Sequence, residues 1–155
     1  RGAAFKGKVM EKNNIVGFTC GAFDILHTGH ALMLKECKEV CDHLIIGLQR
    51  DPSIDRRDKN KPIQSVEERK IMLESLKWVD EIIEYGTEEE LYQILNNMWE
   101  TGRVDIRIIG EDWKGKDFTG NDLSMKVHFN SRKHNWSSSN LRDRIYKAEL
   151  KGRQE

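Results

Sequence analysis

The chain has 155 residues and carries 26 Lys and Arg against 26 Asp and Glu, so its formal net charge is zero. That length suits one domain with a substantial core rather than two. The lack of a basic excess argues against nucleic-acid binding as the main function, and the sequence shows neither an apolar run long enough to span a membrane nor a signal peptide. We therefore expect no nucleic-acid partner, no membrane partner and a cytoplasmic location, which suits reduced cysteine thiols.

The predicted domain lies between two short ends. Residues 1–13 lack hydrophobic periodicity and an initiator Met, so we expect them to lie outside the fold, as a disordered lead or an expression remnant. Residues 14–150 are expected to form a single domain, and residues 151–155 a tail.

One stretch, Gly21 to His30, organises the predicted fold. An apolar run from Ile15 to Cys20 precedes it and predicts a buried parallel strand. The segment from Ala31 to Cys41 follows it, and its apolar residues recur at helical spacing. The stretch therefore lies where a strand passes into a helix N-terminus, which carries free N–H groups and a partial positive charge. Phosphate is the usual anion at such a site.

His27 and His30 are the candidate catalytic residues of this stretch. Their spacing places both rings on one side of a first helical turn, where they can donate hydrogen bonds to charge that develops on a phosphoryl oxygen. Gly21 and Gly29 lack a Cβ and would let the backbone approach a ligand closely. Two structural histidines near a turn are the alternative, but that alternative does not explain the glycines or the preceding strand.

The rest of the chain alternates between predicted strands and helices. Capping boxes at Ser65 and Thr87 begin two helices, and Gly102 ends the second. Further strands are predicted at 44–48, 82–83, 106–109 and 125–129, and a last helix at 138–150. This alternation predicts an α/β fold, a three-layer Rossmann-like domain with a five-stranded, mainly parallel sheet.

Two further segments are predicted near the carboxyl ends of strands, where ligands bind in open α/β sheets. The loop from Arg50 to Pro62 is long and basic, and includes Lys59 and Lys61; a solvated charge run is the alternative. Near the end of the chain, Arg132 precedes three serines at a predicted helix N-terminus, a combination that suits phosphate. A simple helix cap is the alternative there, although one serine would suffice for it.

These residues carry a resemblance to a known family. Gly-x-Phe-Asp-x-Leu-His-x-Gly-His, at 21–30, resembles the signature of the cytidylyltransferase-like nucleotidyltransferases of the HxGH type. Segments 110–116 (Gly-Glu-Asp-Trp-Lys-Gly-Lys) and 132–139 (Arg-x-x-x-Trp-Ser-Ser-Ser) resemble motifs of glycerol-3-phosphate cytidylyltransferases, and 78–81 is similar to their Tyr-Val-Asp-Glu. The resemblance covers nearly the whole chain.

The resemblance implies a CTP-dependent cytidylyltransferase. Such an enzyme moves CMP from CTP to a small phosphorylated alcohol, with glycerol 3-phosphate as the leading candidate, and it releases pyrophosphate and forms a CDP-alcohol. Magnesium would arrive with CTP, and a homodimer is implied. In-line transfer needs no covalent enzyme intermediate, so catalysis would rest on positioning and charge stabilisation.

The resemblance also implies residue roles. The catalytic set is His27, His30, Lys59, Lys61 and Arg132. The nucleotide-binding set is Cys20, Gly21, Ala22, Phe23, Thr28, Gly29, Gly110, Asp112, Trp113, Arg132, Trp136, Ser137, Ser138 and Ser139. The acceptor-binding set is Asp24, Arg57, Lys59 and Lys77, and Arg57 with Lys59 is the alternative to Lys59 with Lys61 as the functional basic pair. Asp24 is the candidate metal ligand, with a buried structural carboxylate as the alternative.

Other functions stay open. Residues 87–91 lack the tryptophan and lysines that glycerol-phosphate enzymes offer near the acceptor, so cytidylyl transfer is better supported than glycerol 3-phosphate as the acceptor. An adenylyltransferase of the same superfamily, making an ADP-sugar or a flavin dinucleotide, shares the signature around His27. A non-catalytic nucleotide-binding module is the alternative from another class.

Overall fold

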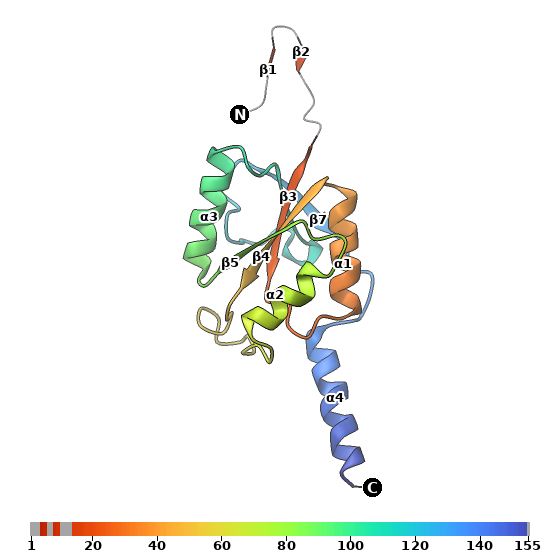
Figure 1. Ribbon diagram of the computed structural model, residues 1–155. Coiled ribbons are helices and arrows are strands. Elements are labelled where there is room, and N and C mark those ends of the chain that lie inside the picture. Colours follow the sequence, from red (N-terminus) through yellow and green to blue (C-terminus); the bar gives the residue numbers. More distant parts are fainter. Residues whose placement is uncertain (1–3, 6–7, 10–13, 155) are drawn as a thin grey trace.

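The computed structural model describes residues 4–5, 8–9 and 14–154 of the chain. Five strands form one sheet in the order β5-β4-β3-β6-β7 (Figure 1). Every neighbouring pair is parallel, so the five predicted strands are confirmed and the sheet is wholly parallel rather than mainly so. The strands are β3 (Val16–Gly21), β4 (His43–Gln49), β5 (Glu81–Tyr85), β6 (Ile106–Gly110) and β7 (Lys126–Asn130).

Helices alternate with these strands, as predicted. The first begins before its predicted start at Ala31 because His27 itself caps it, and it ends at Glu39 rather than Cys41. The predicted capping box at Ser65 is present. The helices are α1 (Thr28–Glu39), α2 (Val66–Glu74), α3 (Glu88–Glu100), the 3-10 helix η1 (Glu111–Trp113) and α4 (Ser138–Gly152).

The second predicted capping box is only half formed. The Thr87 hydroxyl accepts the N–H of Glu90 at 3.1 Å, as predicted. The Glu90 carboxylate, however, accepts the N–H of Gly86 at 2.9 Å instead of that of Thr87. The hydrogen bond to the Glu90 side chain is therefore made one residue before the N-cap residue. The helix still begins where the sequence predicts.

The two ends differ in part from their predictions. Within the predicted lead 1–13, β1 (Ala4–Phe5) and β2 (Lys8–Val9) form a short antiparallel pair in a sheet of their own. The other residues of that lead lie outside the described part of the chain. The predicted tail 151–155 begins inside α4, because that helix continues to Gly152.

The sheet is covered on both faces, which confirms the three-layer prediction. On one face, Leu34 of α1 and Leu73 of α2 pack against Ile46. On the other face, Leu91 of α3 packs in a second cluster with Phe18. Among the described α-helices, α4 alone has no buried residue, and it runs away from the sheet (Figure 1). Within the described residues, no helix has the length and apolar character needed to cross a membrane.

The buried guanidinium of Arg69 joins α2 to two neighbouring loops. Only 2% of Arg69 is exposed. Its Nη1 donates to the carbonyl oxygens of Ala22 and Gln49 at 2.8 and 2.7 Å. Nη2 donates to the carbonyl of Arg50 at 2.6 Å, and Nε to that of Gln64 at 3.1 Å. One side chain therefore ties the segments after β3 and β4 to the start of α2.

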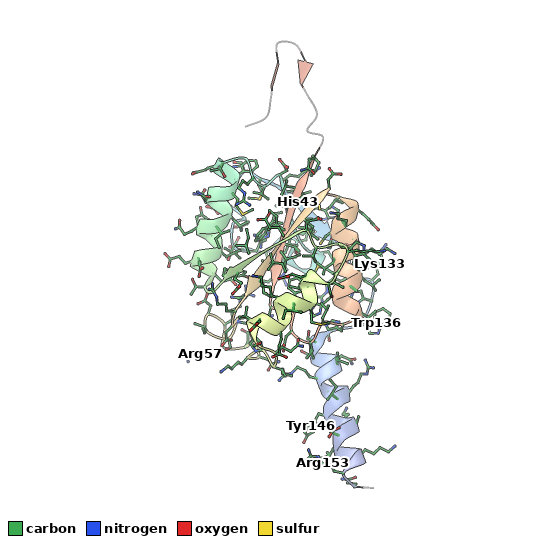
Figure 2. All side chains as sticks on the ribbon, in the orientation of Figure 1. His43, Arg57, Lys133, Trp136, Tyr146 and Arg153 are labelled. Carbon is green, nitrogen blue, oxygen red and sulfur yellow. The ribbon has the colours of Figure 1, made fainter. Side chains whose placement is uncertain are left out.

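We expect Arg69→Met to lower the free energy of unfolding by about 3 kcal/mol or more, because each buried carbonyl left without a donor costs about 1–3 kcal/mol. Urea denaturation would measure the change. Arg57→Met, which removes an exposed guanidinium on the loop between β4 and α2 (Figure 2), is the matched control and should stay within about 0.5 kcal/mol of the parent. Equal effects of the two substitutions would contradict the role given to Arg69.

Candidate active site

A cavity of about 670 Å³ lies at the carboxyl edge of the sheet, a volume suited to a small-molecule ligand. The strand order reverses between β3 and β6, and ligands of doubly wound sheets bind at such a point. The predicted residues that line the cavity are Cys20, Gly21, Ala22, His27, Gly29, His30, Lys59, Gly110, Asp112, Trp113, Arg132, Trp136, Ser137 and Ser138. Those that do not line it are Phe23, Asp24, Thr28, Arg57, Lys61, Lys77 and Ser139.

The two histidines form the capping box of α1. His27 Nδ1 accepts the N–H of Gly29 at 3.0 Å, and His30 Nδ1 accepts the N–H of His27 at 3.3 Å. A neutral ring that accepts through Nδ1 carries its proton on Nε2. The ring centroids lie 3.9 Å apart, and each ring keeps an Nε2–H donor that the cap does not use.

Both histidine rings are held neutral. The pKa of His30 is lowered to about 3, mainly by burial and also by the nearby His27, against an opposing effect of Asp24. Burial also lowers the pKa of His27, as does the proximity of His134. Each ring is therefore a neutral hydrogen-bond donor near pH 7, which agrees with its acceptor role in the helix cap.

The turn before α1 has strained backbone angles and is held by hydrogen bonds to the segment just before α2. Phe23 and Ile25 have φ values of 51° and 42°, a region that side chains other than glycine rarely adopt. The Asp24 carboxylate accepts the N–H groups of Ile63 and Gln64 at 2.8 and 2.9 Å. The N–H of Ile25 donates to Gln64 Oε1 at 2.8 Å. These contacts give Asp24 the structural role that the sequence left as its alternative, whereas its roles toward a metal or an acceptor stay predictions.

The N-termini of α1 and α4 meet at the cavity. A Cβ on Gly29 would lie 2.7 Å from the carbonyl oxygen of Trp136, so glycine allows the loop before α4 to approach α1. Ser137 caps α4, and the next hydroxyl, Ser138 Oγ, lies 3.1 Å from His27 Nε2. Two helix ends with free N–H groups therefore border one space, an arrangement that favours anions.

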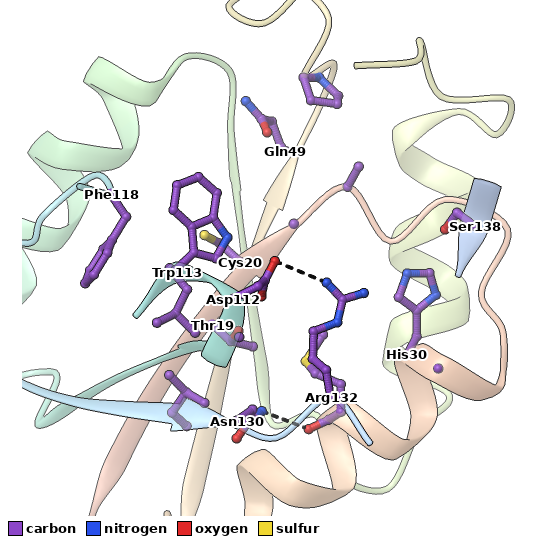
Figure 3. A pocket seen from close by; sticks show the side chains of 18 of the residues that line it. Thr19, Cys20, His30, Gln49, Asp112, Trp113, Phe118, Asn130, Arg132 and Ser138 are labelled. Carbon is purple, nitrogen blue, oxygen red and sulfur yellow. Dashed lines mark hydrogen bonds and ion pairs between the residues drawn. The ribbon is translucent and has the colours of Figure 1, made fainter. Parts of the chain in front are cut away.

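Arg132 lies on the same side of the cavity, on the chain that follows β7. Its Nη1 lies 3.4 Å from Asp112 Oδ2, as Figure 3 shows. The two side chains are 52% and 50% exposed, and such ion pairs contribute little to stability. Arg132 can therefore exchange Asp112 for a phosphate oxygen at small cost.

The basic loop after β4 brings one lysine to the cavity. Lys59, Arg57 and Lys61 are all exposed, and of the three only Lys59 lines the cavity. Arg56 lines the cavity as well; it forms an ion pair with Glu88, and its guanidinium lies 5.8 Å from the centre of the Trp113 ring. Neither predicted basic pair therefore reaches the cavity as a pair.

A second group of lining residues was not assigned a site role from the sequence. The sequence offered a sign of a special role only for Arg107, which is the one charged residue within the apolar strand 106–109. The others gave none, because the sheet order brings them together from distant segments. These residues are Thr19, Gln49, Tyr85, Glu88, Leu91, Arg107, Phe118 and Thr119.

The described residues include no group of three or more His, Cys, Asp or Glu that would hold a metal ion. The protein thus lacks a carboxylate cage within this part of the chain. Magnesium that arrives with the nucleotide stays a prediction; an ion of that kind is commonly held by substrate phosphates with few protein ligands.

Comparison with known proteins gives matches to a nucleotidyltransferase family and to HldE proteins. A family model described as cytidylyltransferase-like matches residues 18–144. The bifunctional protein HldE of Wolinella succinogenes is 37% identical over 111 residues, which covers 71% of this chain and 22% of that protein. HldE of Helicobacter pylori is 33% identical over 141 residues, which covers 89% of this chain and 29% of that protein. The chain thus spans about a quarter of the length of these curated relatives.

Solved structures share the fold. The lipopolysaccharide core biosynthesis protein from Thermoplasma volcanium superposes with a TM-score of 0.57 at 28% identity, covering 81% of this chain and 100% of that one. Pantoate-beta-alanine ligase from Francisella tularensis superposes with a TM-score of 0.55 at 17% identity, covering 86% of this chain and 67% of that one. The second match shows the fold alone.

The depressed pKa of His30 predicts a loss of stability in acid. Between about pH 6.5 and the folded pKa of about 3, the unfolded state binds a proton that the folded state excludes. Folding stability should therefore fall as the pH falls through this range, by up to about 1.4 kcal/mol per pH unit.

His30→Gln tests this prediction, because Gln at the third helical position completes a capping box without titrating. Urea denaturation from pH 7.5 to 4.5 should show a smaller loss of stability in the variant than in the parent. Parallel stability curves would contradict the shifted His30 pKa.

Proposed function

The chain belongs to the cytidylyltransferase-like family, and from that membership we propose that it transfers a nucleoside monophosphate from a nucleoside triphosphate to a phosphorylated acceptor. The observation that carries the proposal is the pair of neutral histidines, each with an Nε2–H that the helix cap does not use, at a cavity bordered by two helix N-termini. In the reaction, an acceptor phosphate oxygen bonds to the α-phosphorus. The bond from the α-phosphorus to the bridging oxygen breaks, and pyrophosphate leaves.

Positioning and charge stabilisation would supply the catalysis. The N–H groups at the start of α1 and the Nε2–H groups of His27 and His30 are suited to the oxygens on which charge grows. Arg132 and the start of α4 are suited to the same triphosphate from the other side. Lys59 would draw the anionic reactants together. Magnesium, when bound with the nucleotide, would supply charge neutralisation across the phosphates.

We propose ATP as the nucleotide, in place of the CTP that the sequence led us to expect. The relatives named above are HldE proteins, whose nucleotidyltransferase domain serves ADP-heptose synthesis as an adenylyltransferase. This likeness supports the adenylyl alternative better than transfer of CMP to glycerol 3-phosphate. CTP stays the second candidate because Gly110 to Lys116 resemble a motif of cytidylyltransferases.

A sugar phosphate is the acceptor that accompanies the ATP proposal. The cavity supports this choice with aromatic side chains and hydroxyl groups, among them Trp113, Phe118, Tyr85 and Thr119, which suit the faces and hydroxyls of a sugar. A homodimer remains a proposal that rests on the family resemblance, and a cytoplasmic location remains one that rests on the sequence.

The nucleotide is tested with the four nucleoside triphosphates at equal concentration. We expect ATP to raise the melting temperature most, because a ligand that binds only the folded state stabilises it by about 2.7 kcal/mol at 100 times its Kd. Pyrophosphate release with ATP should then require a sugar 1-phosphate. AMP and CMP, which lack the leaving group, are the controls.

A larger shift with CTP, together with CMP transfer, would move the assignment to the cytidylyl branch. No shift and no pyrophosphate release with any triphosphate would refute nucleotidyl transfer.

The catalytic role of His27 calls for a substitution that keeps the helix cap. Because His27 caps α1, Ala would also remove a capping acceptor, whereas Ser is a good N-cap residue. We expect His27→Ser to reduce kcat by roughly 100- to 1000-fold, as for the loss of one preorganised donor. The melting temperature should change little. His43→Ser, at the opposite end of the sheet, is the control; near-normal kcat in His27→Ser would return this ring to a structural role.

A further inference from the structure

The guanidinium of Arg107 is buried at the edge of the cavity and incompletely bonded. Only 4% of Arg107 is exposed, although the residue lines the cavity. Its Nη1 donates to the carbonyl of Thr119 at 2.9 Å, and Nη2 donates to Cys20 Sγ at 3.5 Å. Nε is buried and has no hydrogen-bond partner among the described residues. A guanidinium has five N–H donors, so part of its capacity is unused.

Among the described residues, no carboxylate forms an ion pair with Arg107. Its acceptors, a carbonyl and a thiol, are uncharged. Glu88, a carboxylate on the same cavity, is engaged by Arg56 and by the Thr119 hydroxyl. The rings of Phe18 and Phe118, at 5.8 and 5.6 Å, compensate the charge only in part. A buried cation of this kind is costly unless an anion joins it.

Arg107 belongs to the side of the cavity that faces away from the histidines. Figure 3 shows His30 and Ser138 on one side, and Cys20, Trp113 and Phe118 on the other. Arg107 contacts Cys20 and lies over Phe118, which places its guanidinium on the second side. The cavity therefore has two separate cationic ends, one formed by the helix N-termini and Arg132 and the other by Arg107.

We propose that the acceptor carries a second anionic group, a carboxylate or a further phosphate, which pairs with Arg107. This inference rests on the proposed nucleotidyl transfer. The first phosphate of the acceptor attacks the nucleotide beside His27 and His30, while the second group is bound on the far side. The buried fork of Arg107 suits two oxygens of one oxyanion. The substrate class is thus a small phosphorylated compound with two acidic ends.

Matched acceptor pairs test the proposal. Glucose 1-phosphate is compared with glucuronic acid 1-phosphate and glucose 1,6-bisphosphate, and glycerol 3-phosphate with 3-phosphoglycerate. Isothermal titration calorimetry measures their binding to protein saturated with the α,β-methylene analogue of ATP or of CTP. We expect the doubly acidic member of at least one pair to bind tenfold or more tightly than its partner, and Arg107→Met to remove that preference.

A purely structural Arg107 would give a different result, because loss of the Thr119 contact would weaken both members of a pair equally. Arg107→Lys should keep part of the preference, and it serves as the folded variant if Arg107→Met is unstable. Arg103→Met, an exposed arginine paired with Glu81, is the control and should leave the preference unchanged.

Equal binding of both members by the parent protein, or binding of none, overturns the second anionic group. An equal loss of affinity for both members of a pair in the Arg107 variants overturns it as well. These experiments measure binding, so their outcome is independent of the pyrophosphate-release assay. Nucleotidyl transfer without a preference for the doubly acidic acceptor would leave the proposed function intact and refute this inference alone.

Discussion

The cavity depends on backbone bonds that fix the carboxyl edge of the sheet. Arg69, from α2, holds carbonyl groups on both loops that leave β3 and β4. Asp24 works in the reverse sense, since this carboxylate on the turn after β3 accepts N–H groups just before α2. The turn that presents His27 is thus anchored by a cation and by an anion. This double anchoring explains how Phe23 and Ile25 keep backbone angles that they would avoid alone.

The histidines combine structure and chemistry in single side chains. Each uses Nδ1 to complete the cap of α1, and this bond leaves Nε2 as the protonated nitrogen. Burial keeps the pKa of His30 far below neutrality, so the ring donates without carrying charge. The same contact therefore begins the helix, fixes the tautomer and orients a donor at the cavity. A side chain fixed in this way needs no reorganisation when charge develops on a bound oxygen.

Local patterns in the sequence predicted the strands, the helices and the main motif. The apolar runs and the capping box at Ser65 act over a few residues, and the structure confirms them. The hydrogen-bond partners of Asp24, and those of Arg69 other than Gln64, lie 19 to 47 residues away in the chain, so no local pattern contains them. The capping role of His27 was missed because histidine is not a usual N-cap residue. Lys59 and Lys61 lie two residues apart, yet only Lys59 lines the cavity, since the path of the loop rather than its composition decides which side chain reaches the cavity.

The cations around the cavity differ in what they would contribute to binding. Arg132 and Arg56 already pair with carboxylates in partly exposed positions, so a ligand that takes either of them must replace an existing, weak ion pair. Arg107 has no carboxylate partner among the described residues, so the free-energy cost of burying its charge is present in the folded protein before any ligand binds. A ligand oxyanion at Arg107 would relieve that cost, so its contribution to affinity exceeds that of an equal contact at Arg132. The exposed pairs then suit a nucleotide that must enter and leave, and the buried arginine suits the group that distinguishes one acceptor from another.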